Sequence, residues 1–144
     1  MRPFNVFISL PPIVLFVVLN LAHGQSVGVA DKEIAWNANE LTDKNYSNKI
    51  STPLRLVTKG RTTIELHRGT VQTLTFTILS VKGNWSDQNT DGTLEYSVRS
   101  HNSVPGKVTV RREGRSITAW VDFTETNKNG LNIELIIDSI EERR

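Results

Sequence analysis

From residue 54 onward, apolar and polar residues alternate in short segments that are separated by turns containing glycine. This period of two places the apolar side chains on one face of an extended segment. Segments of this kind, rich in Val, Ile, Thr and Leu, are typical of an all-β domain. The chain has no cysteine, so the apolar core has to stabilise the domain without disulfide bonds. Zinc sites built on thiolates, iron–sulfur clusters and cysteine nucleophiles are excluded for the same reason.

Three turns allow neighbouring segments to be paired so that their apolar side chains share one face, as a buried face requires. The predicted pairs are Leu56 with Ile64 and Leu54 with Leu66 across a turn at 59–61, Val110 with Ile117 and Val108 with Ala119 across a turn at 113–114, and Phe123 with Leu131, Val121 with Ile133, Ala119 with Leu135 and Ile117 with Ile137 across a turn at 127–130. The last three strands therefore agree on one inward face.

Two places interrupt this alternation. A tight turn after residue 68 would place Leu66 opposite Val71. Val71 would then lie on the opposite face of the strand from the next apolar residues, Leu74 and Phe76. A β-bulge near residues 72–73 would restore the parity. In the last segment two isoleucines fall on the polar face, which predicts another bulge near Asp138.

The segments follow one another through short loops, without a βαβ pattern or an amphipathic helix. About seven or eight strands joined in this way predict an antiparallel meander that closes into a small up-and-down barrel. The alternative is a β-sandwich of two sheets. Residues 25–50 are predicted to be a polar lead-in that contributes one short strand or turn of helix, and residues 51–144 the barrel or sandwich domain.

Residues 1–24 have the pattern of a secretory signal peptide. Arg2 gives a basic start, residues 6–21 are mostly apolar, and Ala22 and Gly24 occupy positions −3 and −1 of the predicted cut. A membrane anchor is the alternative, but it needs about 20 uninterrupted apolar residues, and prolines and an asparagine interrupt this stretch. The sequence therefore predicts a secreted or periplasmic protein with no transmembrane segment after cleavage.

The charges of the chain are interspersed and nearly balanced. The 17 Lys and Arg residues and 15 Asp and Glu residues give a formal net charge of +2. Removal of Arg2 with the signal peptide leaves +1. No basic stripe runs along any segment, so we expect no nucleic-acid partner.

One loop matches the opening of a calcium-binding loop. Asp87, Asn89 and Asp91 supply oxygen atoms at positions 1, 3 and 5, and a glycine follows at position 6. Position 12, which should be a bidentate glutamate, is a valine here, and Glu95 at position 9 is the candidate substitute. The alternative is a polar hairpin connection in which these residues adopt turn conformations. Calcium at this loop is the one cofactor that the sequence suggests.

Two tryptophans are the candidate binding residues for a ligand or partner. The predicted register places Trp120 on the outward face, where an exposed aromatic ring can stack on a sugar or anchor a partner. The same register places Lys107 opposite Trp120 and Ile136 diagonally across from it, so local cover by a lysine stem is the alternative. Trp85 lies next to the Asp87 loop and is expected to plug one end of the core.

The triplet Gly83-Asn84-Trp85 resembles the Gly-x-Trp motif of lipocalins. In that family the motif lies on the first barrel strand, whereas here it lies past the middle of the mature chain. The resemblance covers three residues. It fits a small lipocalin-like barrel, although about 120 residues are few for an eight-stranded barrel with a large cavity.

These features lead to three hypotheses about function. The first is a non-catalytic binding or envelope-associated module that acts through loop ends or an outer sheet face on a protein, a glycan or a small apolar ligand. The second is a lipocalin-like carrier of an apolar ligand, with a lumen lined by Phe76, Tyr96, Val110, Val121 and Leu135.

The third hypothesis is a hydrolase with a carboxylate-based or histidine-based site. The mature chain has two histidines, His67 and His101, each beside a predicted turn. Neither has a second histidine at metal-ligand spacing, and no carboxylate pair stands out. We therefore expect that the protein is not an enzyme.

Overall fold

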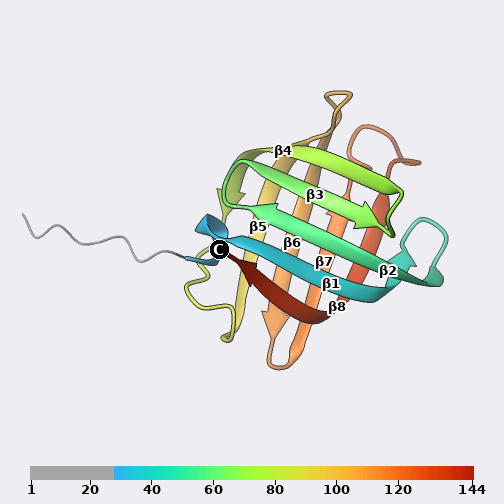
Figure 1. Cartoon of the computed structure of the whole chain (residues 1–144). Helices are drawn as coiled ribbons and strands as arrows, with labels where there is room; N and C mark the ends of the chain where they lie inside the picture. The colour runs from blue at the N-terminus through green and yellow to red at the C-terminus, as the bar shows by residue number, and fades with distance from the viewer. Residues whose placement is uncertain (1–27) are drawn as a thin grey trace, which may run out of the picture.

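The computed structural model describes residues 28–144 (Figure 1). The predicted signal peptide at residues 1–24 and its cleavage site lie outside the described residues. Within the described part of the chain, no helix is long and apolar enough to cross a membrane. The short helix at the start of the described chain lies beside the C-terminus (Figure 1).

The chain is built almost entirely from strands. In order, its elements are the 3-10 helix η1 (Val29–Asp31) and the strands β1 (Glu33–Asp43), β2 (Asn48–Lys59), β3 (Thr63–Arg68), β4 (Gln72–Lys82), β5 (Gly92–Arg99), β6 (Pro105–Glu113), β7 (Ser116–Asp122) and β8 (Asn132–Arg143). Each strand pairs antiparallel with the next, and β8 returns to pair with β1. The predicted meander barrel is therefore confirmed, and the alternative two-sheet sandwich is wrong.

The two ends of the barrel carry different loops (Figure 1). We call one end the sealed end. It holds η1, the turns β2–β3 and β6–β7, and the long β4–β5 connection. We call the other end the mouth. It is surrounded by the loops β1–β2, β3–β4, β5–β6 and β7–β8.

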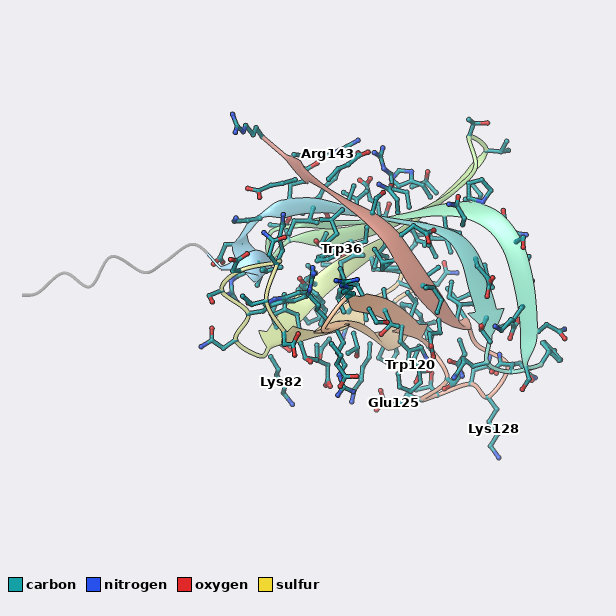
Figure 2. The ribbon with its side chains drawn as sticks, turned by 90° about the horizontal axis from the view of Figure 1, so that it is seen from below. Trp36, Lys82, Trp120, Glu125, Lys128 and Arg143 are labelled. Carbon is teal, nitrogen blue, oxygen red and sulfur yellow. The ribbon has the colours of Figure 1, made fainter. Side chains whose placement is uncertain are left out.

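The interior of the barrel is filled by apolar side chains from every strand. Trp36 and Tyr96 are the largest side chains that are completely buried, and Trp36 points into the barrel in Figure 2. Apart from residues with aromatic rings, Thr58 is the one buried residue with a polar side chain among the described residues. Its hydroxyl accepts a hydrogen bond from Trp36 Nε1 at 3.1 Å, which satisfies the indole N–H inside the core.

The last hairpin has the predicted register, whereas the registers predicted for the other two are each wrong by two residues. The observed pairs include Val121 with Ile133, Leu56 with Leu66 and Val110 with Ala119. The two shifted turns begin with Gly60 (φ 55°) and Gly114 (φ 61°), because glycine adopts a positive φ without a steric cost. A shift of two keeps the same side chains on the inner face, so alternation alone could not reveal it.

The β3–β4 hairpin also differs from its prediction. Leu66 pairs with Leu74 rather than with Val71, which lies at the tip of the turn. The expected bulge near residues 72–73 is therefore absent from this hairpin, since a three-residue loop already restores the parity. The irregularity in β4 lies at Leu79, where the register with β5 shifts by one residue.

The N-terminal prediction was wrong about where the domain begins. Within residues 25–50, described as a polar lead-in, the chain forms the whole of β1 and the start of β2. The inward side chains of β1 are Ile34, Trp36, Ala38 and Leu41. A register shift at Asn39 breaks their alternation, and Ala38 is small, so this strand lacks the regular pattern that marked the others. The barrel starts at Glu33 and not at residue 51.

The bulge expected near Asp138 is present. Asp138 is the extra residue of β8 opposite β1, and its carboxylate accepts a hydrogen bond from the backbone N–H of Asn39 at 2.8 Å. The bulge reverses the side-chain parity. Ile140 consequently packs against the core, whereas Ile136 stays outside and is exposed.

Candidate functional site

Trp85 closes the sealed end of the barrel. Its ring is only 2% exposed and stacks on Trp36 with ring centroids 5.7 Å apart. The indole N–H donates to the carbonyl of Thr90 at 2.9 Å, and the Trp85 carbonyl accepts from the N–H of Val29 in η1 at 2.8 Å. The structure thus places Trp85 in the core, out of reach of a partner, although the sequence suggested it as a binding residue.

Polar contacts tie the loops of the sealed end together. The N–H of Gly114 donates to Asp91 Oδ1 at 2.8 Å, which links the β6–β7 turn to the β4–β5 connection. Arg61 Nε lies 2.7 Å from Asp31 Oδ1 and links the β2–β3 turn to η1. The Arg61 guanidinium also holds the pKa of Asp31 below its ordinary value. These contacts leave little freedom for a ligand to enter from this side.

The calcium candidates have separate contacts in the structure. Asp87 Oδ1 accepts from the N–H of Asn89 at 2.9 Å, as in an Asx turn. The Asp91 carboxylate accepts a hydrogen bond from the backbone of the β6–β7 turn. Glu95 Oε1 lies 3.5 Å from Lys107 Nζ. Between residues 28 and 144, no three His, Cys, Asp or Glu side chains are grouped as metal ligands would be. Calcium binding at this loop remains a prediction.

Trp120 lies on the outer face of the barrel, as predicted, and is 43% exposed. Its Nε1 donates to Asn132 Oδ1 at 2.7 Å, so a neighbouring strand fixes the ring. Lys107 pairs with Asp122 rather than with Trp120, so the predicted position of Lys107 directly opposite the ring is wrong. Ile136 lies diagonally across from Trp120, as expected from the register.

The exposed apolar side chains gather at the mouth. Among the described residues, seven large apolar side chains are exposed, and four of them lie on the strands and loops around the mouth: Tyr46, Ile50, Val71 and Leu74. Val71, at the tip of the β3–β4 turn, is 95% exposed. Exposed apolar groups that cluster in this way mark an interaction site more often than single ones do.

Two apolar cavities open at the same end. One, of about 210 Å³, has Leu41, Leu54, Leu66 and Ile133 among its lining residues, with Arg68 and Asp43 as polar neighbours. The other, of about 290 Å³, is lined in part by Phe76, Val104 and Phe123. Leu74 and Leu131 line both cavities, so the two adjoin one another in the mouth.

The interior beneath the mouth is occupied by side chains. Of the five residues that the carrier hypothesis assigned to a lumen, four line neither mouth cavity and are completely buried: Tyr96, Val110, Val121 and Leu135. Phe76 lies closer to the mouth, where it lines the 290 Å³ cavity and packs against Phe123 with ring centroids 4.8 Å apart. The space for a ligand is therefore at the mouth and not deep in the barrel.

Tyr96 carries a buried hydroxyl that has no hydrogen-bond partner. The nearby Thr58 hydroxyl already accepts from Trp36 and donates to the Ile34 carbonyl. Burial raises the pKa of Tyr96 to about 12, and Thr58 offsets part of this rise. The phenol is thus kept neutral inside an apolar core, where ionisation is costly.

We predict that Tyr96→Phe leaves the free energy of unfolding near pH 7 unchanged or raises it by up to about 1–3 kcal/mol, because a buried hydroxyl without a partner costs desolvation free energy. The ordinary tyrosine pKa is 10.0 and the folded value is about 12. The native protein should therefore lose stability as the pH rises from the first value to the second, since only the unfolded state releases the proton there. Tyr96→Phe should flatten this alkaline loss in urea unfolding, whereas Tyr46→Phe should not. An equal alkaline loss in both variants would contradict the prediction.

A chain of polar contacts lies on the outer face of β3. His67 Nε2 is 2.9 Å from Glu65 Oε2, and its Nδ1 is 3.0 Å from Thr73 Oγ1. Lys59 lies 2.7 Å from Glu65, and Lys59 and then His67 lower the pKa of that carboxyl. Thr73 is the cross-strand partner of His67, so ordinary pairing between β3 and β4 explains the contact. The hydrolase hypothesis remains a prediction.

Sequence reasoning did not find the mouth. A tight turn at Arg68-Gly69 predicts Val71 opposite Leu66, although the position of Val71 beside Gly69 and Thr70 is equally compatible with a place in the turn. A large apolar residue in a turn is exposed to solvent, and this is the signal that could have indicated a binding surface at the mouth. Tyr46, in the segment described as a lead-in, gave the same kind of signal. The cavities depend on which loops meet at one end of the barrel, and this follows from the closed topology.

Comparison with known proteins found no family model, no curated protein and no solved structure that matches this chain.

Proposed function

We propose that the protein is a non-catalytic binding module of the secreted or periplasmic space, and that it holds an apolar part of its ligand in the mouth of the barrel. The observation that carries this proposal is the difference between the two ends. Two adjoining apolar cavities and four exposed apolar side chains lie at the mouth, whereas Trp85 and η1 fill the opposite end.

The energetics favour the mouth over the outer face. Apolar surface gains about 25 cal/mol for each Å² removed from water, and a concave site removes more of a ligand's surface than a flat one does. On the outer face, Trp120 and Ile136 form a small apolar patch, and charged residues such as Glu134 lie among the strands around it. The mouth therefore offers the larger gain to an apolar ligand.

The proposal is tested with the apolar dye anilinonaphthalene sulfonate, whose fluorescence rises in an apolar site. We expect the folded protein to bind the dye with a dissociation constant in the micromolar range. Leu74→Gln, which changes a residue that lines both cavities, should weaken binding at least several-fold. Leu79→Gln is the matched control, because Leu79 lies on the same strand and is exposed but lines neither cavity.

Equal weakening by the two variants would show that the dye binds exposed leucines in general. No binding by the folded wild-type protein would show that the mouth does not accept apolar groups. Either result would overturn the proposed function. Melting temperatures measured for both variants exclude unfolding as the cause of a lost signal.

A further inference from the structure

Part of β4 has a partner strand on one side only. β4 pairs with β3 from Gln72 to Thr77. On its other side, pairing with β5 begins at Thr77 and continues towards Lys82. Residues 72–76 are therefore a short free edge at the mouth, although the barrel is closed along the rest of this seam.

The direction of the backbone groups along this edge follows from a single hydrogen bond. The N–H of Ile78 donates to the carbonyl of Thr62, on the β3 side, at 2.9 Å. Backbone groups of successive residues in an antiparallel strand point to opposite sides. The N–H and C=O groups of Leu74 and Phe76 therefore point towards β3, like those of Ile78. Those of Thr73 and Thr75 point towards the side without a strand.

The loop across the seam does not satisfy these groups. In the β5–β6 loop, the N–H of Ser100 donates to the carbonyl of Val104 at 2.9 Å, and the N–H of Ser103 donates to the carbonyl of Ser100 at 2.9 Å. The loop thus closes its hydrogen bonds on itself. It stands away from β4 across a groove of about 510 Å³, which is lined by residues 73–77 and 100–102.

The groove along the edge is continuous with the mouth. Leu74, Phe76 and Ser100 line both the groove and the 290 Å³ apolar cavity. Side chains of a strand alternate between its two faces. A strand placed in the groove would therefore direct every second side chain towards the apolar cavity and the others over the exposed threonines of β4.

We propose that the free edge of β4 binds an extended peptide segment of a partner protein as an additional strand, with an apolar side chain of the peptide in the mouth. This inference rests on the proposed function and names the ligand class. The free N–H and C=O groups of Thr73 and Thr75 are spaced two residues apart, as in any edge that accepts a strand. A peptide of alternating apolar and small polar residues, without proline at the bonding positions, matches both the edge and the cavity.

The first test is amide hydrogen exchange followed by NMR on the whole chain. In the free protein, we expect the amides of Thr73 and Thr75 to exchange fast, and those of Leu74 and Phe76 to exchange slowly. The probe is a blocked pentapeptide of alternating threonine and valine. Its binding should slow exchange at Thr73 and Thr75. Slow exchange at these two amides in the free monomer would overturn the proposal, because they would already have partners.

Two matched versions of the peptide test the backbone contacts. One carries N-methyl groups on the amides that face β4, and the other carries them on the alternate amides that face solvent. We expect the first version to bind about tenfold more weakly or worse, since each lost hydrogen bond lowers affinity several-fold. The second should bind like the unmodified peptide. Equal affinities of the two versions would overturn strand addition.

A protein variant removes the donor from the edge itself. Thr75→Pro deletes an N–H that faces away from β3, and proline is tolerated at such an edge position. The variant should fold with a similar melting temperature and lose peptide binding. Thr75→Val, which keeps the N–H, is the matched control and should retain binding. Retained binding by a folded Thr75→Pro variant would contradict the proposal.

The outcomes separate this inference from the proposed function. Dye binding at the mouth without any peptide protection of Thr73 and Thr75 would overturn strand addition and leave the binding module intact. Absence of dye binding and of peptide protection together would overturn the binding module and strand addition alike. Protection of the two amides that grows with protein concentration, together with dimers in sedimentation, would identify a second copy of the chain as the occupant. That result would overturn a partner peptide.

Discussion

Trp85→Ala is expected to lower the free energy of unfolding by about 3–5 kcal/mol, the range for removal of a large aromatic side chain from a core. The ring is buried against Trp36 and forms the inner wall of the sealed end. Its removal would leave a cavity and an unpaired carbonyl at Thr90, which now accepts from the indole N–H. A domain of this size has a total stability of about 5–15 kcal/mol, so the loss would be a large part of it.

Urea unfolding followed by circular dichroism measures this effect. The matched control is Trp120→Ala, because Trp120 is 43% exposed on the outer face and does not contribute to the core. Its cost should be less than half of the cost at Trp85. Similar costs at the two tryptophans would contradict the assignment of Trp85 as the residue that closes the barrel.

The same closed end constrains Gly92 of β5. A β-carbon at this position would lie 2.3 Å from the Trp85 ring, well inside the roughly 3.5–4.0 Å contact distance of two carbon atoms. Glycine is therefore required here for close packing. The missing side chain at Gly92 leaves the space that the Trp85 ring occupies.

Gly106→Val is expected to cost about 1–3 kcal/mol by overpacking and to disturb the mouth. A β-carbon at residue 106 would lie 2.4 Å from Phe123 Cδ1. The Phe123 ring, which packs on Phe76 with ring centroids 4.8 Å apart and lines the 290 Å³ cavity, would have to shift. The variant should consequently lose both stability and affinity for the dye.

The control for this variant is Lys107→Val, which introduces the same side chain at the next residue of β6. Lys107 is exposed and points to the opposite face, so this change should leave the cavity intact. Urea unfolding and dye titration are measured on both variants. If Gly106→Val bound the dye as the wild type does, Phe123 could not be a wall of the binding site.

Alternation predicted the barrel and most of its inner face, because a period of two determines which side chains point inward. It could not fix the registers at Leu56 and Val110, since a shift of two residues exposes no apolar side chain. The register of the last hairpin was predicted correctly, although alternation alone would equally have allowed a shift of two residues there. The bulge at Asp138 was also predictable, because without it Ile140 would lie in solvent.

The full length of the strand β1 and the mouth were not predicted, for different reasons. The shift at Asn39 disrupts the alternation of β1 locally, so the sequence indicates only a short strand or a turn of helix there. The mouth depends on four loops that are far apart in the chain and meet only when the barrel closes. Trp85 was correctly placed at one end of the core, yet its burial by η1 depends on Val29, for which the sequence gives no signal.

The central claim is that the mouth is the binding surface and that the opposite end is sealed. Its most direct test is a titration of the labelled wild-type protein with the apolar dye, in which amide and indole NMR signals are mapped on the structure. The account predicts shifts at Leu74, Val104 and Leu131, with the indole signals of Trp85 and Trp120 unchanged. Shifts centred on either tryptophan, with the mouth unchanged, would contradict it.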